Sequence, residues 1–107
     1  MINMKVQNMT SSNGNKIANQ FIINEKGGIM GNFISRETFQ SYDSIIAVRT
    51  VWGENAVAGG RIDIELDEKY WDYSVTTGKY RNQFLNEGIA DTRKKIKSGE
   101  YKLADLN

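Results

Sequence analysis

The segment Arg61–Asp67 alternates charged and apolar residues without a break. Ile62, Ile64 and Leu66 occupy every second position, and acidic side chains stand between them. A period of two places the two sets on opposite faces of a β-strand, so one face is expected in a core and the other in water. The segment therefore predicts a strand in a sheet that is covered on one face.

Three other segments before residue 61 also favour strands. Residues 16–24 alternate, and residues 25–28, which include a Gly-Gly pair, suggest a hairpin into a second short strand at residues 29–34. Residues 45–51 are dense in apolar side chains, as expected of a largely buried central strand. Residues 1–15 are expected to form a short strand or mobile arm followed by a loop, because they are rich in Asn and Ser and contain Asn13-Gly14.

After Asp67 the periodicity becomes helical. Residues 77–85 fit an amphipathic helix, with Thr76 as its expected N-cap and Gly88 as its expected left-handed C-terminal cap. A second short helix is expected at residues 90–98, ended by Gly99. Strands followed by helices predict an α+β fold.

We therefore expect one α+β domain over residues 16–107, preceded by an N-terminal arm or loop at residues 1–15. The expected architecture is an antiparallel sheet of three to five strands, formed by residues 16–67, with one or two C-terminal helices packed on one face. The chain shows no internal repeat.

The composition limits the chemistry, since the 107 residues include no Cys, His or Pro. A disulfide framework, a thiolate nucleophile, a Ser-His-Asp triad and a His-ligated or Cys-ligated zinc site are excluded. The net charge of +1, from 14 basic and 13 acidic residues, is not the excess typical of extensive phosphate binding. No cofactor is expected. The sequence has neither a long apolar run nor a visible secretory signal, so we expect no membrane association and a cytoplasmic location.

A row of carboxylates, Asp63, Glu65 and Asp67, is the main candidate for metal-dependent catalysis. Oxygen ligands suit Mg²⁺ or Ca²⁺. Successive side chains on one face of a strand lie ~6.5–7 Å apart, however, so the three cannot share one ion without distortion of the backbone. A solvated strand face that resists aggregation explains them better, unless they converge with another acid such as Asp72.

Aromatic rings interleaved with cations form a second candidate site at residues 70–84. Such pairs can stack unpaired bases or form contacts with a protein, and they can also build a small core. Trp71 and Phe84 are the expected core members. The candidate binding residues are Tyr73, Lys79, Tyr80 and Arg81.

The expected second helix supplies further cations. Arg93, Lys94 and Lys97 are candidate partner contacts, and Lys95 lies among them, so four positive groups in five positions cannot all face one side. They could form a nonspecific nucleic-acid patch, although a solvated helix surface is the simpler explanation.

Two segments carry a family resemblance. Residues 39–47, FQSYDSIIA, are similar to an FxSYxSxIA segment, and residues 70–85, YWDYSVTTGKYRNQFL, are similar to a YWDYSxTTxKYxxxFL segment. Together they resemble a family of small, functionally uncharacterised proteins from bacteriophages and other mobile elements. The resemblance covers residues 16–107 and implies a context without implying an activity.

One departure from that family stands out. Its members pass from the central strand to the next through a short turn, whereas residues 49–60 here make a longer excursion. Trp52, Glu54 and Asn55 in this excursion are further candidate partner contacts, unless it is only a tolerated surface insertion.

The resemblance, the small size and the missing catalytic groups favour a non-enzymatic accessory protein of a phage or mobile element. Such a protein is expected to bind and inhibit a host protein, and a defence nuclease such as a CRISPR effector is one possible target. The alternative is a module that binds single-stranded nucleic acid through aromatic stacking and basic residues. A carboxylate-and-metal enzyme ranks third, and the oligomeric state is left open.

Overall fold

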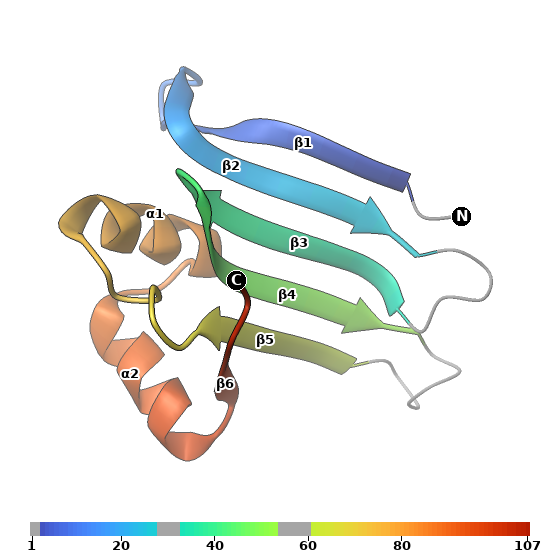
Figure 1. The fold of residues 1–107 in the computed structure, drawn as a ribbon, viewed down its shortest axis with the longest axis vertical. Coiled ribbons are helices and arrows are strands. Elements are labelled where there is room, and N and C mark those ends of the chain that lie inside the picture. The colour runs from blue at the N-terminus through green and yellow to red at the C-terminus, as the bar shows by residue number, and fades with distance from the viewer. Residues whose placement is uncertain (1–2, 28–32, 54–60) are drawn as a thin grey trace.

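A computed structural model describes residues 3–27, 33–53 and 61–107. Within these ranges the chain forms one six-stranded sheet and two helices (Figure 1). The strands are β1 (Asn3–Thr10), β2 (Lys16–Lys26), β3 (Phe33–Ser41), β4 (Ser44–Trp52), β5 (Arg61–Asp67) and β6 (Tyr101–Ala104), and the helices are α1 (Val75–Leu85) and α2 (Ile89–Ser98).

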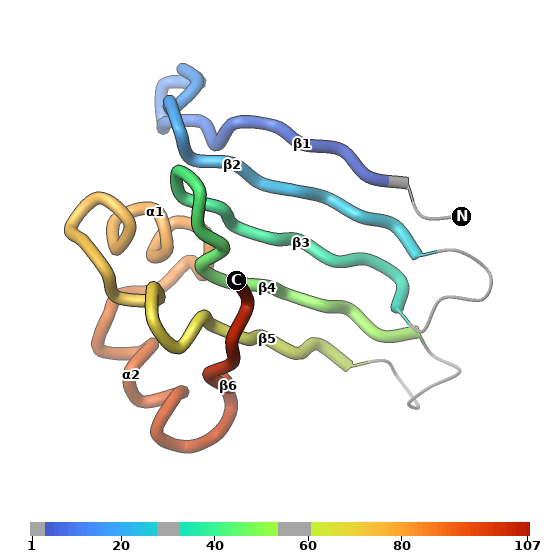
Figure 2. The backbone as a smooth tube through the Cα atoms, in the orientation of Figure 1, coloured from blue at the N-terminus to red at the C-terminus, as the bar shows by residue number. Residues whose placement is uncertain are grey.

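The strands lie in the sheet in their order along the chain. Strands β1 to β5 pair with antiparallel neighbours, and β6 returns after the two helices to pair parallel with β5. The backbone trace shows both helices at one end of the sheet, with α1 beside the turn between β3 and β4 and α2 beside β6 (Figure 2).

The expected α+β architecture with two C-terminal helices packed against the sheet is confirmed. The sheet is wider than residues 16–67 because β1 and β6 add a strand at each edge, which makes six strands where three to five were expected. Of the two expectations for the N-terminus, the structure shows a strand at Asn3–Thr10. The expected strand at residues 29–34 falls partly outside the described residues, and its last two residues begin β3.

The core lies between the helices and one face of the sheet. Phe39, Ala47 and Leu66 stand opposite one another on β3, β4 and β5, and all three are fully buried. The Phe84 ring of α1 stacks on Phe39, with ring centroids 5.9 Å apart. We call this side of the sheet the helix face; Ile22 continues its row onto β2.

Helix α1 starts and ends at different residues from those expected. Its N-cap is Ser74 and not Thr76, and the Ser74 Oγ accepts a hydrogen bond of 3.1 Å from the Thr77 amide. Its left-handed C-cap is Asn86, with φ of 56°, in place of Gly88. Asparagine tolerates this conformation better than most side chains.

Helix α2 follows almost at once. Gly88 occupies the N-cap position of α2, with φ of −89°, and makes no side-chain cap bond. At the other end Gly99 adopts φ of 87°, so the expected glycine stop is confirmed. None of the helices in the described part of the chain is long and apolar enough to cross a membrane.

Candidate functional site

The face of the sheet opposite the helices forms a continuous surface, which we call the open face. Register places two rows of side chains on it, because residues opposite one another on neighbouring strands share a face. One row is Val6, Ile23, Thr38, Val48, Glu65 and Lys102, and the other is Met4, Glu25, Arg36, Thr50 and Asp63.

The open face combines apolar and charged groups. Its apolar side chains are at the β1 edge and in the middle, and Met4 and Val6 are 63% and 57% exposed. Its charges come in opposite signs at neighbouring positions: Glu25 stands opposite Arg36, and Glu65 stands opposite Lys102. This mixture of charges of both signs with apolar groups is better suited to binding a partner surface of mixed polarity than to binding a row of phosphates.

Trp52 marks one corner of the open face. Its indole Nε1 donates a 2.7 Å hydrogen bond to Asp63 Oδ2, and the Arg61 Nε lies 3.2 Å from the same oxygen. The Arg61 guanidinium also lies over the Trp52 ring, 5.3 Å from its centroid. The predicted contact residue Trp52 is thus fixed on this face, whereas Glu54 and Asn55 lie outside the described residues.

Beside Trp52 a hollow of about 300 Å³ opens between β4, β5 and β6. Arg36 lines it together with Glu65 and Lys102. The Arg36 Nε donates to the buried Thr50 Oγ1 at 3.3 Å, and its guanidinium lies over the Phe33 ring, 4.2 Å from the centroid. These contacts hold the arginine flat along the sheet.

The aromatic candidates divide between surface and core. Tyr73 is 69% exposed and meets Tyr70 edge to face, with centroids 5.3 Å apart. Tyr80 is half-buried and packs against the core, while exposed Lys79 places its ammonium 5.3 Å from the Tyr80 ring centroid. Phe84 is buried, and partly buried Trp71 packs against the core, as expected of both.

Arg81 needs a correction, because it was expected to be an accessible cation. It is 1% exposed. Its Nη1 donates to the Trp71 carbonyl at 2.8 Å and lies 3.3 Å from Asp72 Oδ1. The guanidinium lies beside Gly78, where an added Cβ would make an ordinary contact of 3.6 Å with Nη2. Arg81 therefore holds the segment before α1 in place and is not exposed to a partner.

The cations of α2 divide as the sequence indicated. Arg93, Lys94 and Lys97 are exposed, and at about 100° per residue they span an arc of about 100° on one side of the helix. Lys95 points the other way and forms a 2.7 Å ion pair with Glu87. Arg93 Nη2 also lies 3.6 Å from Asp72 Oδ2. Tyr73, Lys79 and these cations belong to the helical side of the molecule, apart from the open face.

The acidic row of β5 has separate structural partners. Asp63 binds Trp52 and Arg61 on the open face, as described above. Asp67 is buried, and its Oδ2 accepts hydrogen bonds from the Lys69 and Tyr70 amides, while its Oδ1 accepts one from the Leu106 amide. In residues 3–27, 33–53 and 61–107 no group of three acids is arranged to hold a metal ion.

Asp67 and Glu87 are the buried acids whose pKa values shift. Burial acts to raise the pKa of Asp67, but the hydrogen bonds from the Leu106, Tyr70 and Lys69 amides and the Asn107 side chain leave it below its usual value. Burial also acts to raise the pKa of Glu87, and hydrogen bonds from Lys95, Thr92 and Tyr101 outweigh it and lower the pKa. Both carboxylates therefore stay ionised and serve the fold.

These features define an α+β protein whose sheet carries helices on one face and an open mosaic of charged and apolar groups on the other. The chain belongs to a family of unknown function, DUF8033, whose model matches residues 4–102. No curated protein and no solved structure matches the chain.

Proposed function

We propose that this protein is a non-enzymatic accessory protein that binds a partner protein through the open face of its sheet. The observation that carries the proposal is the row from Val6 to Lys102, which crosses all six strands. An antiparallel sheet with one solvated face is ordinarily apolar on the inside and polar on the outside. Here apolar Val6, Ile23 and Val48 occupy the outside.

The charge pattern supports a protein partner over a nucleic acid. Each cation in the two rows of the open face has an acidic cross-strand neighbour: Arg36 faces Glu25, and Lys102 faces Glu65. The acidic side chains would repel a phosphate backbone, whereas a protein surface can present matching charges of both signs. Protein interfaces are also enriched in aromatic and arginine side chains, and half-buried Trp52 and Arg36 supply both types.

The context is a second part of the proposal. The resemblance to phage and mobile-element proteins points to a host protein as the partner, in the cytoplasm of the host cell, and to inhibition as the outcome. A defence nuclease such as a CRISPR effector is the target class to test first. Inhibition by occupation of a surface requires no catalytic group in this chain.

The test compares wild-type protein with Val48→Lys. Val48 lies in the middle of the open face, and a lysine there keeps its stem on the sheet while placing a charge inside the expected interface. Val75→Lys is the matched control, because Val75 is 92% exposed at the start of α1. Tagged wild-type protein should recover a host protein from lysate, and the purified partner should bind Val48→Lys at least tenfold more weakly and Val75→Lys equally well.

Two results would overturn this proposal. One is recovery of no host protein above background. The other is equal binding of the purified partner to wild type and to folded Val48→Lys, with folding checked by circular dichroism. Inhibition is tested separately by adding the protein to a purified defence nuclease, where undiminished cleavage at saturating protein excludes that target.

The exposed cations of α2 favour single-stranded nucleic acid as a second candidate. Arg93, Lys94 and Lys97 share one side of the helix, as shown above. A fluorescent 20-nucleotide thymidine oligomer, titrated at low salt, tests this candidate. Binding that weakens with salt and is lost when the three cations are replaced by glutamine would support it. No binding at low salt would exclude it.

A further inference from the structure

We infer that the free edge of β1 binds an extended acidic segment of the partner by strand addition. This inference rests on the proposed function and specifies one element of the interface. The observations that carry it are the unpaired outer side of β1, a groove along that strand and the lysines on and beside it.

No described strand pairs with the outer side of β1, and the Thr10 carbonyl at its end accepts a hydrogen bond from Gln83. Strand β2 pairs with the other side of β1 from Asn3 to Thr10. Every second residue of an edge strand turns its N–H and C=O groups outward, where they can pair with another chain. The opposite edge, β6, has four residues, whereas β1 has eight.

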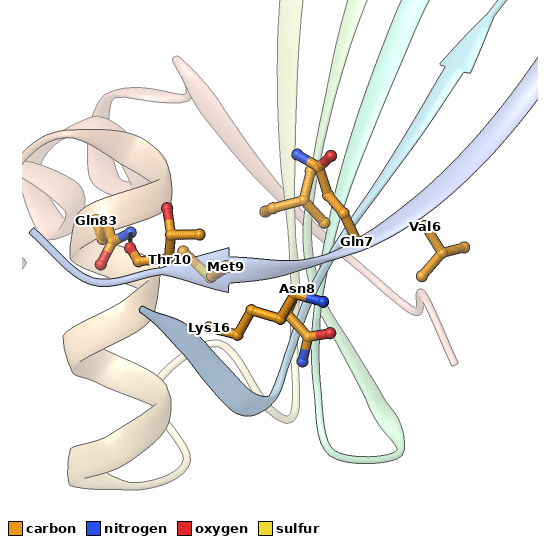
Figure 3. Close-up of a pocket in the computed structure, with 8 residues that line it drawn as sticks. Val6, Gln7, Asn8, Met9, Thr10, Lys16 and Gln83 are labelled. Carbon is orange, nitrogen blue, oxygen red and sulfur yellow. Dashed lines mark hydrogen bonds between the residues drawn. The ribbon is translucent and has the colours of Figure 1, made fainter. Parts of the chain in front are cut away.

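A groove of about 490 Å³ lies along β1, and Ile22 of β2, on the helix face, and Gln83 of α1 also line it. Figure 3 shows Gln7 and Asn8 leaving β1 on opposite sides, with Gln83 of α1 close to Thr10. The Gln83 Nε2 donates a 2.9 Å hydrogen bond to the Thr10 carbonyl, which ties the end of β1 to the helix. An added strand gains affinity from main-chain hydrogen bonds and specificity from pockets for alternate side chains, and this groove offers such a pocket.

Lysines lie on and beside β1, and one of them, Lys16, lines the groove. β1 contains Lys5 and no carboxylate, and Lys16 and Lys26 flank it on β2. All three lysines are exposed, and none forms an ion pair with a carboxylate in the described part of the chain. A second copy paired along β1 would bring a second lysine-bearing edge against the first. The charge of these lysines therefore favours an acidic occupant over self-pairing.

The alternation of β1 specifies the pattern of that occupant. Met4 and Val6 point to the open face, and Lys5 points to the helix face, because Val6 lies in the open-face row. An added strand places its own alternate side chains on the same two faces. Apolar residues of the occupant would then meet Met4 and Val6, and acidic residues would meet Lys5.

The probe is an acetylated and amidated octapeptide of alternating valine and glutamate, titrated into ¹⁵N-labelled full-length protein. We expect amide shifts concentrated in β1 and in the residues lining its groove. Lys5→Glu should weaken binding at least fivefold, and Lys97→Glu on α2 should leave it unchanged. Two further peptides carry N-methyl groups on every second residue, one on the odd-numbered and one on the even-numbered residues. Only one of the two should lose binding, because every second N–H of an added strand faces the protein.

Several outcomes would overturn the inference. They are no binding of the octapeptide, equal binding of a valine–lysine octapeptide, shifts that map away from β1, or concentration-dependent β1 shifts without peptide, which would identify a second copy as the occupant. In each of these cases the proposed function would still hold if Val48→Lys weakens binding of the partner. Failure of the inference is therefore distinguishable from failure of the proposed function.

Discussion

The Tyr101 hydroxyl donates a 2.9 Å hydrogen bond to Glu87 Oε1 and thereby joins the last strand to the link between the two helices. The same carboxylate accepts hydrogen bonds from Lys95 Nζ at 2.7 Å and from Thr92 Oγ1 at 2.6 Å. Burial and then the hydrogen bond to Glu87 raise the pKa of Tyr101, and the hydrogen bond to Glu87 raises that of Lys95. This cluster locks α2 and β6 together.

Replacement of Glu87 by glutamine should lower the free energy of unfolding by ~1–3 kcal/mol, because the buried donors lose a charged acceptor. Urea unfolding at pH 7 measures the loss. The matched control is Asp91→Asn, which neutralises an exposed acid on α2 and should change stability by less than ~0.5 kcal/mol. Equal losses in the two variants would contradict the role of Glu87.

The same carboxylate predicts a pH dependence. Because the pKa of Glu87 is lower in the folded state than its ordinary value of 4.5, the folded state holds the charged form more strongly than the unfolded state does. Its contribution to stability is present above about pH 4.5 and is lost as the pH falls through the folded pKa. The stability difference between wild type and Glu87→Gln should therefore shrink in acid, and a difference that grows as the pH falls below that value would contradict this assignment.

Asp67→Asn should release the C-terminal segment. The carboxylate accepts hydrogen bonds from the Lys69, Tyr70 and Leu106 amides, and an Asn side chain would turn donor hydrogens toward one of them. We expect a loss of ~1–3 kcal/mol and faster amide exchange at Leu106, measured by NMR. Unchanged exchange at Leu106 would show that Asp67 does not hold the segment.

Arg81→Lys tests whether Arg81 stabilises the fold. A lysine lacks the planar group that reaches both the Trp71 carbonyl and Asp72, so unfolding should become easier by ~1–3 kcal/mol. Lys79→Arg is the reciprocal control on the exposed side of α1 and should be neutral. A thermal melt of Arg81→Lys that matches wild type would show that the guanidinium does not stabilise the fold.

The glycines that flank α2 should respond in opposite directions. Gly99→Ala forces a side chain into φ of 87° and should cost ~1 kcal/mol, although nothing lies within 4 Å of the new Cβ. Gly88→Ser supplies the cap oxygen that α2 lacks and should gain about 0.3 kcal/mol. Thermal unfolding of the two variants measures both effects. A stabilising Gly99→Ala together with a destabilising Gly88→Ser would refute the capping assignments.

Local pattern predicted the strands and helices better than it predicted which residues face water. The alternation of β5 correctly indicated a strand with Leu66 in the core, yet Ile62 on the same face is 63% exposed. The two helices cover only one end of the sheet, so the far end of each strand lacks a cover (Figure 1). How far a helix extends over a sheet is a tertiary property that periodicity does not contain.

The candidate site was less predictable for a related reason. The charge of Arg81 favoured a surface position, although its spacing from Thr77 and Leu85 places it on the buried face of α1, beside the Trp71 ring. The open face was missed because its residues come from six strands, and no single segment shows the row. One signal was available: β1 alternates Met4 and Val6 with Lys5 and Gln7, a strand pattern obscured by the Asn and Thr residues beside it.

The most direct test of the central claim is methyl cross-saturation NMR on the complex with the captured partner, using protein labelled at its Ile and Val methyl groups. Saturation of the partner should reduce the signals of Val6, Ile23 and Val48 on the open face and leave that of Val75 on α1 unchanged. Loss of signal at Val75, with Val6, Ile23 and Val48 unaffected, would place the partner on the helical side and contradict the account.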